Sequence, residues 1–305
     1  NHTKVNTVDL YHACGKIGVM SGRLTLKQMD QMAVTIREDI IRMLEHAGSG
    51  HSAGPLGMAD IFTALYFSVL KHDPKNPDWD ERDILLLSNG HTVPVRYATM
   101  ARAGYFDIDE LMTLRRFGSR LQGHPERVKL PGMETTSGPL GSGLSQGAGM
   151  AYVLQNIDNN PQRWVYVMMG DGELDEGNIW EAAMFAGKNK LHNLIGIIDR
   201  NNIQIDGSTE DVMPLENLKE KWESFGWHVL EIDGNNIESI IDACSMARAI
   251  TNKPSVIIAH TIPGKGVDFM EYDYHWHGAP PNSEQAKKAL KELRTLAGKI
   301  RSEHE

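Results

Sequence analysis

The stretch over residues 164–207 constrains the fold more than any other part of the chain. An apolar run over 164–169 has the length and residue types of a buried strand, and it stops at a Gly-Asp-Gly turn at 170–172. A helical pattern over 178–191 follows, and a second apolar run then leads to an Asn-Asn pair at 201–202. This order predicts a strand–helix–strand unit with an acidic turn after its first strand.

Ligands of open parallel sheets bind beyond the carboxyl ends of the strands, so Asp171 and the Asn pair are expected to converge on one ligand. Mg2+ takes one or two carboxylates from a protein and fills its other positions with phosphate oxygens, carbonyls and water. Gly170 and Gly172 let a diphosphate approach the backbone, and the following helix directs N–H groups towards it. The turn therefore predicts a metal–phosphate site. The alternative is an ordinary strand-turn-helix in which Asp171 only caps the helix.

Strand-like runs alternate with helical patterns along the chain, which predicts an α/β fold with a single doubly wound, mainly parallel sheet and helices on both faces. Further strands are expected at 83–87, 194–198, 227–232 and 255–260, and further helices at 26–43, 59–70, 93–103, 109–117, 215–225, 237–249 and 283–305. Residues 1–23 are expected to form a loosely held arm. The last helix, which is highly charged, is expected to face solvent.

The charge and composition argue against several classes of protein. The net charge is −9, and Lys and Arg form no long block, so there is no electrostatic signature of nucleic-acid binding. No apolar run approaches the roughly 20 residues of a membrane span, and the N-terminus lacks the pattern of a secretory signal. Cys14 and Cys244 lie in unrelated contexts without a C-x-x-C motif, which is typical of reduced thiols in a cytoplasmic protein.

Four histidines adjoin glycine in predicted loops: His51, His91, His124 and His277. One such histidine is more often a surface residue than a catalyst, but four with the same pattern favour a shared site. There the imidazoles would donate hydrogen bonds and move protons near neutral pH. A zinc site is the rival interpretation, although no pair has i, i+4 spacing and no Cys accompanies them.

The segment GDGELDEGNIWEAAMFAGKNKLHNLIGIIDRNNIQIDG resembles the thiamine-diphosphate-binding motif in the form that transketolases carry. The segments SGHSAGPLG, LSNGH, LQGHPE, TTSGPLGSG and HWHGAP resemble other motifs of that family, in the family's order. The resemblance implies the thiamine-diphosphate-binding fold for residues 24–281, as the module that binds the diphosphate (the PP module). It also implies that 282–305 form a C-terminal helix packed on the same domain.

The resemblance also implies roles for individual residues. The metal ligands would be Asp171, Asn201 and the carbonyl of Ile203, holding Mg2+, for which Ca2+ or Mn2+ can substitute. The residues implied to contact thiamine diphosphate are His91, Gly138, Pro139, Leu140, Gly172, Asn201, Ile205 and His277. The residues implied to act on substrate or in catalysis are His51, His91, His124, His277 and Glu176, the last by coupling two active sites across a dimer. Pro263 departs from the family pattern, which commonly has a Lys there.

A full-length transketolase is much longer than this chain, so the resemblance implies the N-terminal subunit of a split transketolase. Such an enzyme transfers a two-carbon ketol unit from a ketose phosphate or sulfonate to an aldose acceptor. It would act only with a C-terminal subunit that carries the pyrimidine-binding module and its activating Glu, in an α2β2 heterotetramer. Two alternatives remain open: the α subunit of a thiamine-dependent 2-oxo acid dehydrogenase, and a non-catalytic module that binds Mg2+ and phosphate.

Overall fold

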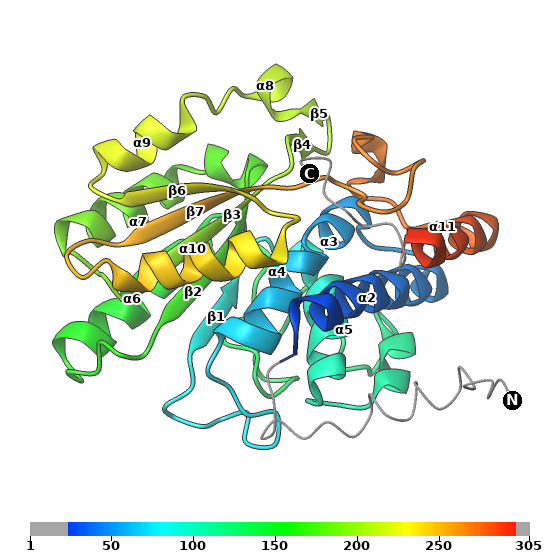
Figure 1. Ribbon diagram of the computed structural model, residues 1–305, viewed down its shortest axis with the longest axis horizontal. Helices are drawn as coiled ribbons and strands as arrows, with labels where there is room; N and C mark the ends of the chain where they lie inside the picture. Colours follow the sequence, from blue (N-terminus) through cyan, green and yellow to red (C-terminus); the bar gives the residue numbers. More distant parts are fainter. Residues whose placement is uncertain (1–23, 297–305) are drawn as a thin grey trace, which may run out of the picture.

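A parallel sheet forms the centre of the protein, and helices cover both of its faces (Figure 1). The computed structural model describes residues 24–296. The strands of the sheet are β1 (Ile84–Leu87), β2 (Val165–Gly170), β3 (Leu194–Arg200), β6 (His228–Asp233) and β7 (Ser255–His260). Their order is β1-β2-β3-β7-β6, and every neighbouring pair is parallel. The predicted doubly wound α/β fold is confirmed, while the predicted N-terminal arm, Cys14 and residues 297–305 lie outside the described range.

Helices of the described range share two buried apolar cores with the two faces of the sheet. One core includes residues of α2 (Leu26–Ala47), α4 (Ala59–Ala64), α5 (Val93–Ala103) and α10 (Ile237–Ala249), and the other includes residues of α6 (Ser142–Asn156), α7 (Gly177–Lys188) and α9 (Leu218–Ser224). The smaller elements are α3 (Ala53–Gly57), α8 (Thr209–Val212), the strands β4 (Ile203–Gln204) and β5 (Gly207–Ser208) of a hairpin, and the helical turns η1 (Leu65–Val69), η2 (Gly90–Thr92), η3 (Ile108–Thr113), η4 (Gly172–Asp175) and η5 (Tyr274–Trp276).

The strands β1, β2, β3 and β7 are mainly apolar because both of their faces are covered, whereas the edge strand β6 is only partly buried. Successive side chains point to opposite faces, so each strand supplies two cores. In β1, Leu85 and Leu87 belong to the core under α2, α4, α5 and α10, whereas Ile84 and Leu86 belong to the core under α6, α7 and α9. A parallel sheet buried in this way leaves only its edges and strand ends available for function.

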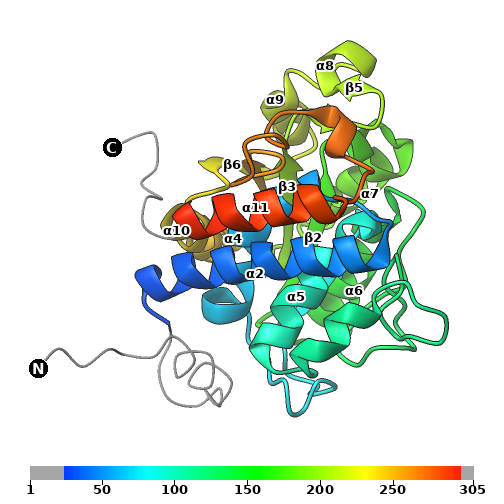
Figure 2. The ribbon, with the colours of Figure 1, turned by 90° about the vertical axis from the view of Figure 1, so that its right-hand side faces the viewer.

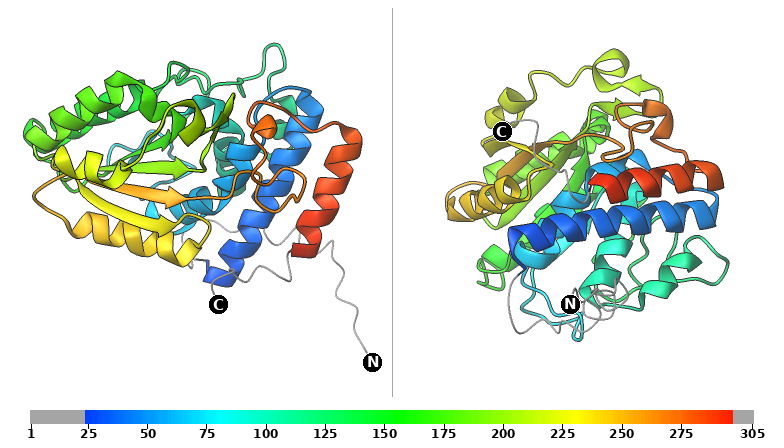
Figure 3. Two further views of the ribbon diagram at one scale, coloured as in Figure 1. Left: turned by 90° about the horizontal axis from the view of Figure 1, so that it is seen from above. Right: turned by 45° about the vertical axis from the view of Figure 1, so that its right-hand side comes forward.

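The helix α2 begins and ends where the sequence indicates. Thr25 and Gln28 form a capping box at its start, and Gly48 ends it in a left-handed conformation at φ 65°. The last helix, α11 (Ser283–Leu296), runs alongside α2 (Figures 2 and 3). Ala286 and Leu293 of α11 are buried in the apolar core that also contains residues of α2, so the expectation of a purely solvent-facing helix is wrong. Within residues 24–296, no helix has the length and apolar content needed to cross a membrane.

Three helix predictions differ from the structure. The region predicted as a helix over 109–117 holds only the 3-10 turn η3, and Arg115 just beyond it has a left-handed backbone at φ 59°, which cannot continue a right-handed helix. The helix predicted over 59–70 consists of α4 followed by the π-helical turn η1. The helix predicted over 215–225 begins only at Leu218, whose backbone N–H donates to the carboxylate of Glu216 at 3.1 Å.

Two glycines bring α6 close to the sheet. A side-chain carbon added at Gly143 would lie 2.4 Å from both Cβ and Oγ of Ser88, and one at Gly147 would lie 2.4 Å from Cγ2 of Val167. Only glycine permits so close an approach of helix and strand. The start of α6 is therefore held against the loop that follows β1 and against β2 itself.

Candidate cofactor and active site

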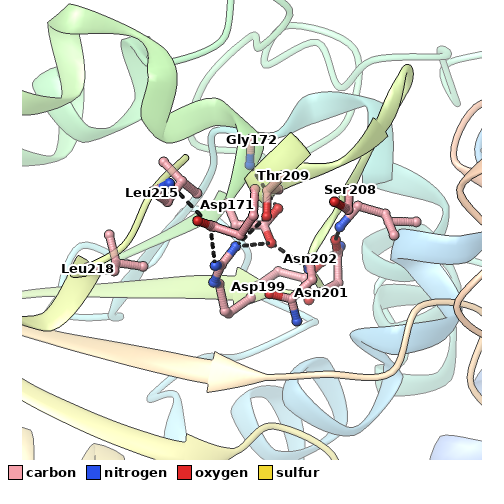
Figure 4. Close-up of polar contacts among 12 residues, drawn as sticks. Asp171, Gly172, Asp199, Asn201, Asn202, Ser208, Thr209, Leu215 and Leu218 are labelled. Carbon is pink, nitrogen blue, oxygen red and sulfur yellow. Dashed lines mark hydrogen bonds and ion pairs between the residues drawn. The ribbon is translucent and has the colours of Figure 1, made fainter. Parts of the chain in front are cut away.

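The acidic turn and the Asn pair meet at the carboxyl ends of β2 and β3 (Figure 4). The parallel register pairs Gly170 with Asp199, which brings the two following loops together. One carboxylate oxygen of Asp171 accepts from the backbone N–H of Asn202 at 2.6 Å, and the other accepts from Gly172 at 2.8 Å. Asn202 has a left-handed backbone at φ 63°, which asparagine tolerates better than most residues. The predicted convergence of these loops is confirmed.

The oxygen atoms at this point are of the type that a hard divalent cation binds. The side-chain amide of Asn201 is held in one orientation, because its nitrogen donates to Asp199 at 2.7 Å and its oxygen accepts from the backbone N–H of Ile203 at 3.0 Å. Asp171, Asn201 and the carbonyl of Ile203 thus offer one carboxylate, one amide and one carbonyl, which suits Mg2+ with phosphate and water in the remaining positions. In the described part of the chain, no three His, Cys, Asp or Glu side chains are grouped so as to hold a metal, which gives the zinc interpretation no support.

A buried arginine that the sequence did not single out lies beside this turn. The guanidinium of Arg200 is 3 % exposed and lies 3.3 Å from Asp171. It also donates to the hydroxyl of Thr209 at 2.7 Å and to the carboxylates of Glu210 and Glu216 at 2.9 Å each. Arg200 therefore ties the segment after the β4–β5 hairpin to the predicted metal ligand. Because "DRNN" reads as an exposed loop, nothing local in the sequence indicated this buried role.

The carboxylates at the turn are shifted towards their neutral forms. Burial raises the pKa of Asp171 to about 6, against the lowering effects of its N–H donors and of Arg200. Burial also raises the pKa of Asp199 to about 7, and the neighbouring charge of Asp171 adds to that shift. The charged forms of Asp171 and Asp199 are therefore costly at this turn, and a bound cation would offset that cost.

Among residues 24–296, several buried polar atoms around these loops have no hydrogen-bond partner. They are Nδ1 of His51, Oδ1 of Asn89, Oγ of Ser137 and Nδ1 of His277. Buried polar atoms are almost always paired in folded proteins, so a group of orphans marks a place for ligand or ordered water. Asn89 follows β1, and its Cβ lies 3.7 Å from the position of a Cβ added at Gly170. The loop that carries His91 therefore lies next to the acidic turn.

The residues predicted to contact the cofactor rings lie open beside these orphans. A Cβ added at Gly138 would have no atom within 4 Å, and Pro139 and Leu140 are exposed at the same turn. Ile205, at the tip of the β4–β5 hairpin, is 67 % exposed. An apolar surface next to polar atoms and a cation-binding turn fits a ligand with an aromatic ring at one end and a diphosphate at the other. The residues present therefore fit thiamine diphosphate.

Three of the four predicted histidines form one cluster. The ring centroid of His51 lies 4.8 Å from that of His91 and 5.8 Å from that of His277, and the last two are 5.2 Å apart. The hydroxyl of Ser52 donates to the carbonyl of Ala279 at 2.6 Å, which holds two of the histidine loops together. His124 is exposed and lies outside this cluster. Its ring is near the loop of His91, since a Cβ added at Gly90 would lie 3.3 Å from it.

All three clustered imidazoles are held in the neutral form. Burial lowers the pKa of His51 to about 4, and the charges of His277, Arg115 and His124 lower it further. Burial also lowers the pKa of His91, with contributions from the neighbouring histidines, and burial alone lowers that of His277. A neutral imidazole has one nitrogen that donates and one that accepts a hydrogen bond, so the cluster can both bind hydroxyls and move protons.

The neutral state of His51 predicts a pH dependence of stability. Because folding lowers this pKa from 6.5 to about 4, the folded protein binds fewer protons than the unfolded chain in that interval, and stability is lost as the pH falls through it. Glutamine does not titrate, so His51→Gln lacks this loss of stability. The melting temperature of the variant minus that of wild type should therefore be higher at about pH 5 than at about pH 7.5, by on the order of 2 °C. His192→Gln, at the loop between α7 and β3, is the control. A difference from wild type that is constant with pH would contradict the prediction.

A second arginine missed by the sequence lies beside His124. A Cβ added at Gly123 would come within 2.7 Å of the Arg115 guanidinium, so glycine is needed for the arginine to lie there. Arg115 donates to the hydroxyl of Ser49 at 3.3 Å. It lines an open pocket of about 490 Å³ together with Gln122, Gly123, His124, Pro125, Glu126, Thr136 and Ser137. Its charge also lowers the pKa of His124, after the larger effect of burial.

Comparison with known proteins relates this geometry to a family. The family described as "Transketolase, thiamine diphosphate binding domain" matches residues 28–297. The 6-deoxy-6-sulfo-D-fructose transketolase subunit SqwG of Clostridium sp. (strain MSTE9) is 44 % identical over 265 residues, which cover 87 % of this chain and 96 % of that protein. One of the subunits of the apulose-4-phosphate transketolase of Phocaeicola vulgatus is 40 % identical over 268 residues, which cover 88 % of this chain and 94 % of that protein.

Solved structures show the same relationship. A transketolase of Campylobacter jejuni superposes with a TM-score of 0.83 at 36 % identity, and the match covers 90 % of this chain and 43 % of that one. A transketolase of Pichia stipitis in complex with sedoheptulose 7-phosphate gives a TM-score of 0.83 at 35 % identity, covering 89 % and 41 %. The chain thus spans less than half the length of these transketolases, but nearly the whole length of the two named subunits.

Proposed function

The chain belongs to the transketolase family, and from this premise we propose that it is the N-terminal, cofactor-binding subunit of a split transketolase. Two observations carry the proposal: Asp171 and the Asn pair converge at the carboxyl ends of β2 and β3, and the His51–His91–His277 cluster includes the loop after β1, whose Asn89 approaches Gly170. The matching subunits, which this chain covers almost completely, are named transketolase subunits, so the 2-oxo acid dehydrogenase and non-catalytic alternatives are not favoured.

In this proposal Asp171, Asn201 and the Ile203 carbonyl hold Mg2+, and the backbone at Gly172 receives the diphosphate. The open turn at Gly138, Pro139 and Leu140 and the exposed Ile205 contact the rings of the cofactor. When bound, thiamine diphosphate supplies the nucleophilic carbon and the electron sink for transfer of a two-carbon ketol unit. The protein's own contribution is to hold and orient that group and to keep water from the reacting atoms.

The histidines act on the sugar. His51, His91 and His277 lie within one cluster and are neutral, so their ring nitrogens can donate to one hydroxyl while accepting a proton from another. The unpaired Nδ1 atoms of His51 and His277 are available for such bonds. His124 stands outside the cluster on the wall of the open pocket, where it would bind a hydroxyl further along the sugar.

We propose that the site is completed by a C-terminal subunit, in an α2β2 assembly, with Glu176 at the contact between the two halves. Glu176 is exposed, close to the open turn at Gly141. Further along the same two helices, α6 and α7 expose a group of large apolar side chains: Tyr152, Val153, Met184 and Phe185. Exposed apolar groups of this kind mark interaction surfaces, which supports a contact between subunits on this side of the molecule.

The substrate class follows from the relatives and is part of the proposal. The named subunits belong to transketolases of a sulfonated and a phosphorylated sugar, so the donor is expected to be a ketose with one anionic end. The test mixes the chain with its C-terminal subunit, thiamine diphosphate and Mg2+, and measures two-carbon transfer to an aldose. The donors are 6-deoxy-6-sulfofructose, apulose 4-phosphate and sedoheptulose 7-phosphate.

The chain alone should give no transfer above background, whereas the mixture should transfer two carbons from at least one donor. A reaction that contains only the C-terminal subunit is the matching control. Oxidation of a 2-oxo acid by the mixture would favour the dehydrogenase alternative instead. An absence of transfer from all three donors would count against the proposal.

A further inference from the structure

A buried carboxylate joins three loops of the proposed cofactor site. Glu173 lies in the turn η4, two residues after Asp171, and is only 3 % exposed. One of its oxygens accepts from the hydroxyl of Ser88 and from the backbone N–H of Gly141 at 2.7 Å. The other accepts from the backbone N–H of Gly170 at 3.0 Å. These donors come from the loop after β1, the open glycine turn and the end of β2.

The contacts continue from Ser88 into the first turn of α6. The Ser88 hydroxyl donates to Glu173 and at the same time accepts from the backbone N–H of Gly143 at 3.0 Å. Glu173 thus reaches two N–H groups at the start of α6, one directly through Gly141 and one through Ser88. N–H groups at a helix start have no partner in the helix itself, and they carry the positive end of the helix dipole.

This arrangement explains how a carboxylate tolerates the position. Burial raises the pKa of Glu173, and the bonds from Ser88, Gly141 and Gly170 oppose that rise because each donor stabilises the charged form. The start of α6 supplies one of these donors directly, Gly141, and holds a second, Ser88, through Gly143, and its dipole favours a negative charge there. The carboxylate and the helix start therefore stabilise each other.

We propose that Glu173 is a positioning residue that fixes the open glycine turn and the 88–91 loop relative to the acidic turn, so that the cofactor cradle exists before its ligand arrives. This inference rests on the proposed function. The turn at Gly138–Gly141 would contact the cofactor rings, His91 follows Ser88 by three residues, and Gly170 precedes the metal ligand. One side chain therefore sets the distance between ring, imidazole and metal, without touching any of them.

A carboxylate is required because all of its partners donate hydrogen bonds. In Glu173→Gln, one oxygen becomes an NH2 group that can only donate. Whichever way the amide turns, it opposes an N–H group: that of Gly170 in one orientation and that of Gly141 in the other. The volume of the side chain is unchanged, so the variant removes one hydrogen-bond acceptor and leaves the packing in place.

The test compares Glu173→Gln and Ser88→Ala with Asp83→Asn. Asp83 is also a buried carboxylate that accepts from backbone N–H groups, those of Lys71 at 2.9 Å and Trp164 at 3.2 Å. It lies just before β1, at the opposite end of the strands from Glu173, so it reports the general cost of disturbing such a group. Each variant is studied by three measurements, together with the C-terminal subunit. These are the melting temperature, hydrogen exchange of residues 138–147 and calorimetric titration with thiamine diphosphate in excess Mg2+.

Glu173→Gln is expected to speed exchange in 138–147 and to weaken thiamine diphosphate binding by about 10- to 100-fold, as loss of a group that orients a ligand's contacts usually does. Ser88→Ala should have a smaller effect in the same direction, since Gly141 and Gly170 keep their acceptor. Asp83→Asn should lower the melting temperature yet keep wild-type exchange in 138–147 and wild-type cofactor affinity.

Wild-type exchange in 138–147, or wild-type cofactor affinity, in Glu173→Gln would overturn the inference. So would an equal loss of affinity in Asp83→Asn, since the effect would then be one of general stability. Failure of the proposed function is visible separately, because the wild-type assembly itself would then not bind thiamine diphosphate. The exchange of 138–147 in Glu173→Gln would still decide whether this carboxylate orders the three loops.

Discussion

Asp171→Asn should lower Mg2+-dependent binding of thiamine diphosphate at least about 100-fold, and two-carbon transfer should fall with it. The substitution keeps the shape of the side chain but removes the one carboxylate among the proposed metal ligands. It also places an NH2 group where the carboxylate accepts from Gly172, Asn202 and Arg200. The metal would lose its charged ligand, and the turn would lose an acceptor.

The fold should survive this substitution. Burial already raises the pKa of Asp171 to about 6, so the charged form is costly in the protein without a metal, and a neutral side chain avoids that cost. Arg200 keeps its bonds to Thr209, Glu210 and Glu216. The measurement is a calorimetric titration with thiamine diphosphate across a range of Mg2+ concentrations, together with the melting temperature of each protein.

Asp206→Asn is the control for Asp171→Asn, because Asp206 is an exposed carboxylate in the β4–β5 hairpin, which also holds Ile203 and its proposed ligand carbonyl. It should bind thiamine diphosphate as wild type does. Unchanged cofactor affinity in a folded Asp171→Asn protein would show that the metal lies elsewhere. A loss of affinity in Asp206→Asn of similar size would instead point to a general effect of charge in the hairpin.

His277→Ala should reduce two-carbon transfer by about 100-fold or more, in line with the loss of a group that transfers protons. Its ring lies 5.8 Å from that of His51 and 5.2 Å from that of His91, and its buried Nδ1 has no hydrogen-bond partner among the described residues. Removing it takes away one wall of the cluster and one proton carrier. The loss should lie mainly in kcat, while affinity for Mg2+ stays close to wild type because the acidic turn is untouched.

His275→Ala provides a close comparison for His277→Ala. His275 is two residues away in the same loop, is 71 % exposed, and bonds to Asp273 at 2.7 Å. Its loss should leave transfer near the wild-type rate. Equal rates for the two variants would remove His277 from the proposed machinery, whether both were active or both inactive.

The sequence predicted best what depends on local pattern. The runs that became β1, β2, β3 and β7 are mainly apolar because both faces of the sheet are covered, so the residue types themselves indicate that these strands are buried. The meeting of Asp171 with the Asn pair followed from a general property of parallel sheets. The resemblance to transketolases, which rested on motifs in a fixed order, is confirmed by the family match over 28–297. The individual site roles stay predictions.

The sequence could not show the side chains whose roles depend on distant partners. Glu173 reads as one more acid in an acidic turn, and only the fold brings Ser88 and Gly141 to it. Arg200 reads as a solvated loop residue, although Glu210 and Glu216 enclose it. The helix predicted over 109–117 failed for a related reason. Its composition favours a helix, whereas the structure uses a left-handed Arg115 to bring a guanidinium against Gly123.

The glycines on the inner side of α6 have a consequence for how such an enzyme can change its substrate. With Gly143 against Ser88 and Gly147 against Val167, the helix has no room to roll or slide on the sheet. The turn proposed to receive the cofactor, Gly138–Gly141, directly precedes Ser142, the first residue of α6, so this half of the site is held rigidly for one ligand. We expect new sugar preferences to arise by exchanging or reshaping the companion subunit, with this chain kept as a common part.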